Sequence, residues 1–296
     1  MTPVTNTSAQ LAYAAANILG EGPVWHSGRK SFFWVDIEAK ELQEIKWPSR
    51  EVKVWDMPKR ISAIVTYGEN CLLVALQGGL AVFDIEPGQL NWFVDLEKDI
   101  VGNRPNDGKC DSSGRFWVGT MDVGAKNYSG SLYSIDQDKT ITKHLSSLSI
   151  SNGLAWSHDD KCFYFIDSSL YRVDRYFFNP GKGKLEFDST AVRIPQESGM
   201  PDGMTIDEEG MLWVAHWDGF CVCRWDPNTG EMLDKIAVPA PQVTSCTFGG
   251  ENLDVLLITT ARVGLREETL LQYPQSGHLF FATPGVKGVP ANKFRD

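Results

Sequence analysis

Polar side chains that could bind a cation recur along the chain at near-regular intervals. Each begins an apolar stretch that runs through a turn rich in Asp, Gly or Ser into an aromatic segment. Carboxylate and amide oxygens of this kind favour hard divalent ions such as Ca²⁺, Mg²⁺ or Mn²⁺. Carboxylates that converge repel one another unless a cation or a proton intervenes. In order, these anchor residues are Glu21, Ser62, Asp107, Asn152, Asp202 and Thr244.

An internal repeat would bring the anchors together. Their successive spacings are 41, 45, 45, 50 and 42 residues. A period of about 40–45 residues with several strands per unit is typical of propeller blades. The copies begin EGPVWHSGRKSFFWVD, SAIVTYGENCLLVAL, DGKCDSSGRFWVGT, NGLAWSHDDKCFYFID, DGMTIDEEGMLWVAH and TSCTFGGENLDVLLITT.

A further strand follows within most units, as in GLAVFDIEPG from Gly79 and GSLYSIDQD from Gly130. Apolar and polar residues alternate in these segments, and long helical periodicity is absent. The sequence predicts an all-β fold: one six-bladed β-propeller over residues 1–296, with four antiparallel strands per blade. GHLFFATPG, from Gly277, should lie in the last blade, and the N-terminal 15 or so residues should add a strand there that closes the ring. Strand periodicity alone leaves an eight-stranded barrel or a sandwich open.

In a propeller, the first strand of each blade lines the central channel, so the anchors should meet at one mouth of it. Polar groups at the inner end of an apolar strand are costly to bury unless they are satisfied. A metal ion in the channel mouth would satisfy them. The alternative is that the anchors cap strands or bind channel water. For Asp107, which precedes a glycine, a local turn is the favoured interpretation.

The charge composition of the chain disfavours some classes of binding partner. Lys and Arg number 28 against 38 Asp and Glu, which gives a net charge of −10. A surface this acidic disfavours binding to nucleic acid or to a membrane. Residues 11–19 are mildly apolar, but no basic residue precedes them, so we expect no secretory signal and a cytoplasmic protein. The sequence does not indicate an oligomeric state.

The cysteines, histidines and tryptophans are interpreted as structural. The six cysteines show no zinc-binding spacing and are expected to be buried free thiols. The five histidines match no ligand spacing, and His216 is expected to be packed or solvated. Core positions are expected for Trp25, Trp117, Trp156 and Trp213. The sequence contains no Gly-x-Ser-x-Gly, no phosphate-binding loop and no His-Glu-x-x-His.

Four segments in four of the repeats resemble the SMP-30/gluconolactonase/regucalcin family. They are LGEGPVW, NRPNDGKCDSSGRFWVGTM, SNGLAWS and PDGMTIDEEGMLWVA, and the similarity extends from about residue 15 to about residue 285. The run RPNDG, GTM, GSLY and TTARVGL is most similar to the bacterial sugar-acid lactonases of that family. The resemblance implies a hydrolase that opens xylono-, arabinono- or gluconolactone to the aldonic acid.

The resemblance also implies site residues and a cofactor. By motif, the metal ligands fall on Glu21, Asn152 and Asp202, and the substrate contacts on Arg104 and Asn106. The cofactor would be one divalent ion: Ca²⁺, Zn²⁺, Mg²⁺, Mn²⁺ or Fe²⁺. An acidic residue that contacts the sugar in the mammalian branch falls near Gly124, and Asp122 is the nearby carboxylate expected to bind substrate.

These residues fit the hydrolysis of an ester. A metal ion can polarise the lactone carbonyl and acidify water. Asp202 is the candidate general base, and Arg104 and Asn106 suit sugar hydroxyls. Two other functions are left open. One is a non-catalytic propeller: a calcium-binding, regucalcin-like regulator or a protein-binding module. The other is an enzyme that hydrolyses organophosphates or bulkier lactones.

Overall fold

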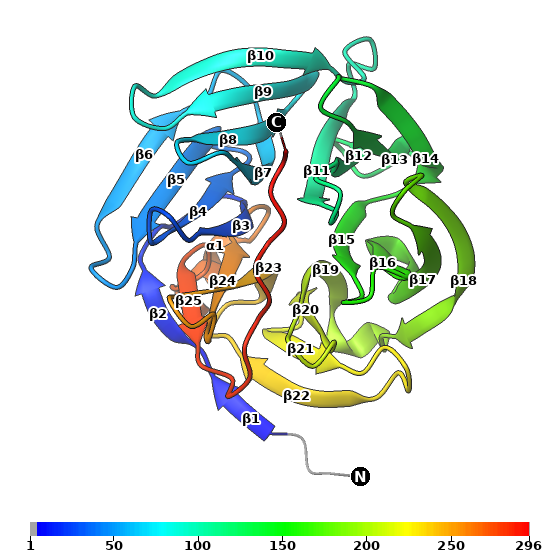
Figure 1. Cartoon of the computed structure of the whole chain (residues 1–296). Coiled ribbons are helices and arrows are strands. Elements are labelled where there is room, and N and C mark those ends of the chain that lie inside the picture. Colours follow the sequence, from blue (N-terminus) through cyan, green and yellow to red (C-terminus); the bar gives the residue numbers. More distant parts are fainter. Residues whose placement is uncertain (1–4, 296) are drawn as a thin grey trace.

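The computed structural model describes residues 5–295, and β-sheets arranged around a central axis make up almost all of the regular secondary structure in this part (Figure 1). The helices within residues 5–295 are short. They are α1 (Glu267–Gln272) and the 3₁₀ turns η1 (Ser168–Leu170) and η2 (Gln196–Ser198). None of these helices is long or apolar enough to cross a membrane. Because strands make up almost all of the regular secondary structure, the all-β prediction is confirmed.

Four of the sheets are four-stranded antiparallel meanders in chain order. The first holds β3 (Gly20–His26), β4 (Ser31–Asp36), β5 (Glu41–Lys46) and β6 (Val52–Asp56). The second holds β7 (Ile61–Tyr67), β8 (Cys71–Leu76), β9 (Gly79–Asp84) and β10 (Gln89–Asp95). The third holds β11 (Asn103–Cys110), β12 (Phe116–Asp122), β13 (Gly130–Ile135) and β14 (Ile141–Leu148). The fourth holds β15 (Ser151–Trp156), β16 (Cys162–Asp167), β17 (Arg172–Asn179) and β18 (Lys184–Arg193).

The remaining nine strands form one sheet made of two groups. A single residue pair, Trp217 with Gln242, joins the groups. The first group holds β19 (Met200–Ile206), β20 (Leu212–Trp217), β21 (Cys221–Trp225), β22 (Met232–Ala237) and β1 (Thr5–Ser8). The second holds β23 (Gln242–Gly249), β24 (Val255–Ala261), β25 (Leu279–Ala282) and β2 (Gln10–Tyr13).

The N-terminal segment borders both groups. β2 pairs antiparallel with β25, in the sheet where the sequence predicted an added strand. β1 pairs parallel with β22, which the sequence analysis did not foresee. The two strands thereby cover edges that would otherwise expose unpaired backbone groups. Residues 1–4, included in the predicted closing segment, lie outside the described residues.

The innermost strands form a closed ring. Each packs against two others in the order β3, β7, β11, β15, β19, β23 and back to β3. Apolar clusters fill the spaces between consecutive sheets or groups, as where Phe33 of β4 and Leu72 of β8 share one cluster. The four tryptophans expected in the core, Trp25, Trp117, Trp156 and Trp213, are buried.

A buried aspartate fastens the turn between the first two strands of a repeat. Asp207 Oδ2 accepts hydrogen bonds from Trp213 Nε1 at 2.9 Å and from Arg224 Nε at 2.7 Å. Asp111 repeats the arrangement, because its Oδ2 accepts from Trp117 Nε1 at 2.8 Å and from Arg115 Nε at 2.7 Å. The turn motif therefore positions the inner strand that precedes it.

Asp207→Ala is expected to lower the free energy of unfolding by about 3–5 kcal/mol, because it leaves the buried Arg224 and Trp213 donors without their acceptor. Urea denaturation would measure the change. The control is Asp159→Ala, in an exposed turn between β15 and β16, which should cost much less. Equal losses in the two variants would contradict the role assigned to Asp207.

Candidate metal centre

The anchors lie where the inner strands bulge. The pairing of β3, β11, β15 and β19 with their neighbours shifts register after Glu21, Pro105, Ser151 and Pro201 respectively. An extra residue in one strand bends the backbone and re-aims a side chain. The bulges explain how an apolar inner strand can begin with a polar side chain that departs from the regular alternation of the strand.

The glycine after an anchor allows neighbouring inner strands to approach closely. A Cβ on Gly153 would lie 2.9 Å from the Asp202 carbonyl oxygen, and one on Gly203 would lie 2.1 Å from Ser245 Oγ. Larger residues at these two positions would force the inner strands apart. The Asn-Gly and Asp-Gly pairs therefore help to bring Asn152 and Asp202 into one site.

The register shows that Asp107 is not the equivalent of Asn152 and Asp202. Both of these residues directly follow the last paired residue before the bulge, and in β11 that position belongs to Asn106. Asp107 therefore lies one residue after the equivalent position, and Glu21, which is the last paired residue before its own bulge, lies one residue before it. Asp107 is nevertheless buried at the centre, where its Oδ1 accepts from Gly108 N at 2.7 Å and its Oδ2 has no hydrogen-bond partner.

A hydrogen-bond chain joins the predicted substrate residues to a predicted metal ligand. Arg104 Nη1 donates to Asn106 Oδ1 at 2.6 Å, and Asn106 Nδ2 lies 3.2 Å from Asn152 Oδ1. Asn152 Nδ2 in turn donates to Ser168 Oγ at 2.8 Å. This donation orients the amide, so that Asn152 Oδ1 faces Asn106 and the interior. The structure thus brings Arg104, Asn106 and Asn152 together.

The two carboxylates of the predicted ligand set are buried and repel each other. Glu21 is 7% exposed and Asp202 6%. Burial, reinforced by the nearby Asp107 charge, raises the pKa of Glu21 from 4.5 to about 8. Burial, followed by the Glu21 and Asp107 charges, also raises the pKa of Asp202 well above its usual range. Glu21, Asn152 and Asp202 therefore form an oxygen donor set that fits a hard divalent cation, whose charge would relieve this repulsion.

Arg104 is a buried positive group whose charge lowers the pKa of both Glu21 and Asp202. Burial lowers its pKa to about 10, while the charges of Glu21 and Glu38 oppose that shift. The guanidinium remains charged at neutral pH and partly balances the carboxylates. Its neighbours include an ion pair that the sequence analysis did not single out, in which Arg60 Nη2 lies 2.9 Å from Glu38 Oε2. No recognisable motif marks Glu38 or Arg60, since only the ring of sheets brings them near Arg104.

Asp122, the predicted substrate contact, accepts hydrogen bonds from its own loop. Its Oδ2 accepts from Lys126 N at 2.9 Å, and backbone hydrogen bonds within this loop lower its pKa. Asp122 ends β12, and it pairs with Asn103, the residue before Arg104. Its role in substrate binding stays a prediction.

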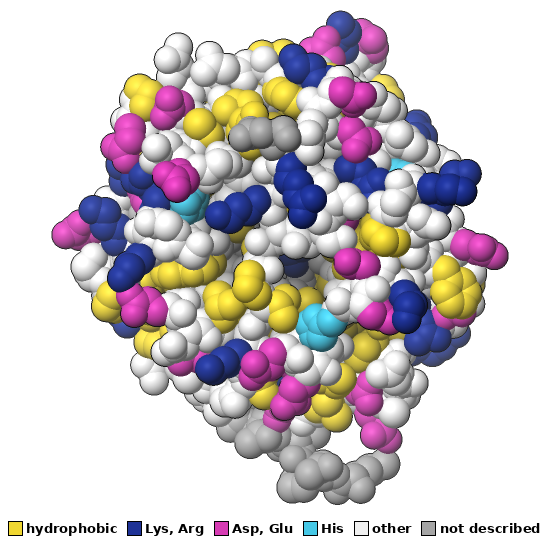
Figure 2. Space-filling view, viewed as in Figure 1, with side chains coloured by type: hydrophobic (Ala, Val, Ile, Leu, Met, Phe, Trp, Pro, Cys, Tyr) yellow, Lys and Arg dark blue, Asp and Glu magenta, His cyan; other side chains and the backbone are white. Residues whose placement is uncertain are grey.

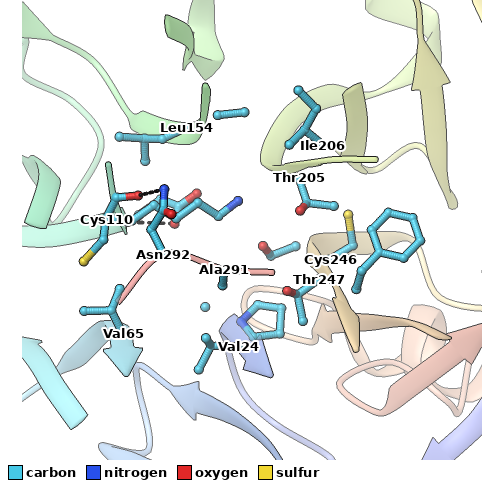
Figure 3. A pocket seen from close by; sticks show the side chains of 18 of the residues that line it. Val24, Val65, Cys110, Leu154, Thr205, Ile206, Cys246, Thr247, Ala291 and Asn292 are labelled. Atoms are coloured by element: carbon cyan, nitrogen blue, oxygen red, sulfur yellow. Dashed lines mark hydrogen bonds between the residues drawn. The ribbon is translucent and has the colours of Figure 1, made fainter. Parts of the chain in front are cut away.

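A cavity of about 120 Å³ lies among the inner strands (Figure 3). Its walls are mostly apolar, as at Val24, Val65 and Leu154, although Asp107 and Lys109 also line it. None of the predicted metal ligands or substrate contacts is among its lining residues. The predicted metal ligands and substrate contacts therefore lie outside this cavity.

The C-terminal segment 287–295 borders that cavity and crosses the far ends of inner strands. Gly288 pairs with Asp207, Phe294 pairs with Tyr67, and Asn292 Nδ2 donates to Cys110 O at 3.3 Å. Acidic and basic side chains are interspersed on the face shown in Figure 2, with no large area of one sign. The closely grouped acidic residues Glu21, Asp107 and Asp202 are buried in the interior.

Metal affinity should rise with pH between 6 and 8. Because the pKa of Glu21 is about 8 without a cation, binding below that pH must displace its proton. Each displaced proton weakens the apparent affinity about tenfold per pH unit. Calorimetric titration in two buffers of different ionisation enthalpy measures the proton release. An affinity that stays constant from pH 6 to pH 8 would contradict the placement of the metal at Glu21.

Comparisons with known proteins identify the family to which the chain belongs. The family model described as the SMP-30/Gluconolactonase/LRE-like region matches residues 19–262. Regucalcin from Bos taurus is 37% identical over 287 residues, which cover 92% of this chain and 93% of the relative. The structure of a calcium-binding regucalcin from Agrobacterium tumefaciens superposes with a TM-score of 0.95, at 30% identity and full coverage of both chains. A luciferin-regenerating enzyme superposes with a TM-score of 0.89, at 33% identity, covering 95% of this chain and 97% of that one. The chain belongs to the SMP-30/gluconolactonase family.

Proposed function

We propose that this protein is a metal-dependent hydrolase that opens sugar-acid lactones, of the xylono-, arabinono- or gluconolactone type, to the aldonic acid. The observation that carries the proposal is the buried convergence of Glu21, Asn152 and Asp202 beside Arg104 and Asn106. The chain's membership of the SMP-30/gluconolactonase family supports the proposal of a lactonase.

We further propose that the fold is a single six-bladed propeller with the metal in the mouth of its central channel. The closed ring of β3, β7, β11, β15, β19 and β23 supports six blades, with the nine-stranded sheet counted as two. Because the C-terminal segment crosses the far ends of the inner strands, the lactone would enter from the anchor end.

When bound, a divalent cation at this site would polarise the lactone carbonyl and lower the pKa of water. Asp202 accepts the proton of the attacking water, and the hydroxyl adds to the carbonyl carbon. The ring C–O bond then breaks, and the proton returns to the departing alkoxide oxygen. Glu21 serves as a charge-balancing ligand, and Asn152 contributes a neutral oxygen that is held in place by Ser168.

Arg104 and Asn106 would bind the sugar. Arg104 uses Nη1 for Asn106 Oδ1 and the Pro105 carbonyl, and its other N–H groups can donate to a sugar hydroxyl or to the carboxylate that forms. Both side chains are buried, so a ligand without hydroxyls would leave them desolvated and unpaired.

Five- and six-carbon aldonolactones should therefore exceed long-chain alkyl lactones in kcat/KM by about 100-fold or more, because the buried donors reward hydroxyl groups. Proton release across a panel of lactones, with spontaneous opening subtracted, would measure the ratio. A higher kcat/KM on an alkyl lactone would contradict a site built for sugars.

The second candidate function is a calcium-binding, regucalcin-like or otherwise non-catalytic protein. It is favoured by the relatives named regucalcin, one of them described as calcium-binding. It requires the same oxygen ligands but no base. Tight Ca²⁺ binding without turnover of any lactone in the panel would favour it.

A further inference from the structure

A second group of metal-ligating side chains lies on the β20–β21 hairpin, outside the oxygen-donor site. His216 pairs with Cys221 across the hairpin, and Val214 pairs with Cys223, so the three side chains share one face of the sheet. One ligand atom from each residue lies within 4.8 Å of the other two. Cys221 Sγ and Cys223 Sγ are 3.5 Å apart.

His216 presents an unused nitrogen in this cluster. Its Nδ1 is 2.9 Å from the Ser198 carbonyl oxygen, and since a carbonyl only accepts, Nδ1 carries the proton. Nε2 therefore holds a lone pair, and it is buried without a hydrogen-bond partner. Such an orphaned acceptor is costly in a side chain that is 0% exposed.

The orientation of this imidazole is the one that metal-binding histidines adopt. A ligating histidine usually donates its second ring nitrogen to a carbonyl or a carboxylate, which fixes the tautomer and the ring. Burial lowers the pKa of His216 to about 4, so the ring is neutral at physiological pH. The Cys221 hydrogen bond and burial raise the pKa of the Cys223 thiol, and the positive charge of Lys235, which lies opposite Cys223 in β22, opposes that rise.

We propose that His216, Cys221 and Cys223 bind one thiophilic divalent cation, with Zn²⁺ as the favoured ion. Zinc–sulfur bonds of about 2.3 Å in a tetrahedral site place two sulfurs about 3.8 Å apart, close to the spacing seen here. Two thiolates and a neutral imidazole around Zn²⁺ carry no net charge, which suits a site whose cysteines are only 1% and 2% exposed.

The donor types separate this site from the one at Glu21, Asn152 and Asp202. Soft thiolates select ions such as Zn²⁺, whereas oxygen donors suit Ca²⁺ or Mg²⁺. Three protein ligands leave one coordination position for a non-protein ligand. The ion would link β20 to β21, and because His216 pairs with Pro201, it would brace the strand that carries Asp202.

The test uses the full-length reduced protein under anaerobic conditions, with excess Ca²⁺ to occupy the oxygen-donor site. Co²⁺ is added as a spectroscopic substitute for Zn²⁺. We expect near-ultraviolet thiolate-to-cobalt charge-transfer absorption that saturates at about one Co²⁺ per chain and disappears when Zn²⁺ is added. An oxygen-only site cannot produce this absorption.

The double variant Cys221→Ser/Cys223→Ser should lose the absorption, and Cys162→Ser, on a different sheet, should retain it. Absence of the absorption in the native chain would overturn the proposal, whatever the folding of the variants. Charge-transfer absorption that persists in the double variant would also overturn the proposal. A third contradictory result is a Cys221–Cys223 disulfide that still forms, by thiol counting, when Zn²⁺ is saturating.

Discussion

Asp202→Asn is expected to bind metal at saturating concentration yet lose kcat by about 100-fold or more, the usual scale for removal of a general base. The asparagine keeps an oxygen that can ligate a cation, but it cannot accept the water proton. Burial and the Glu21 charge raise the pKa of Asp202, so without a cation its carboxyl favours the protonated state. A bound cation reverses that preference and leaves a carboxylate able to act as a base.

Measuring kcat of Asp202→Asn at rising metal concentration separates the two roles of this residue. If Asp202 is both ligand and base, occupancy recovers and turnover does not. The matched control is Asp159→Asn, an exposed carboxylate outside the site, which should turn over like the native protein. Near-complete rescue by metal would reject the general-base role and leave the ligand role standing.

Glu21→Gln and Asn152→Ala are each expected to lower the metal affinity by more than about 100-fold. Glu21→Gln removes the charge of a ligand, and Asn152→Ala removes a ligand oxygen. Losing only the hydrogen-bond partner of a ligand typically lowers metal affinity by roughly 10–100-fold, and these changes remove more than that. Both should still fold: Glu21→Gln removes a repelling buried charge, and its neighbour Gly22 N can still donate to an amide oxygen. Calorimetric metal titration measures the affinities.

The control for the ligand variants is Glu251→Gln, which changes an exposed carboxylate paired with Lys30. Its metal affinity should match that of the native chain. Unchanged affinity in Glu21→Gln, Asn152→Ala and Asp202→Asn together would reject the assigned ligand set.

The sequence predicted the inner strands and most of the buried centre, because both depend on patterns within one repeat. An apolar stretch, a turn and an aromatic strand each leave a local signal. Glu21, Asn152 and Asp202 were predicted by their place at the start of such stretches and by family motifs. The closed ring of inner strands then brings together residues that lie far apart in the sequence.

What the sequence could not supply was the exact register between strands. Asp107 was chosen over Asn106 because both are polar and adjacent, and only the bulge shows which one matches Asn152. The His216–Cys221 pairing has the same origin: a spacing of five residues gives no zinc motif, but a tight hairpin makes the two side chains neighbours. The joining of two groups into one nine-stranded sheet depends on one residue pair, Trp217 with Gln242.

A cation held by Glu21, Asn152 and Asp202 is expected to be required for lactone hydrolysis. The most direct measurement is proton release from the best aldonolactone by metal-stripped protein, before and after reconstitution with each divalent ion, with spontaneous opening subtracted. The proposal predicts no rate above background in the stripped protein and recovery in proportion to occupancy of the oxygen-donor site. An unchanged rate in fully stripped protein, or no turnover of any aldonolactone at full occupancy, would contradict it.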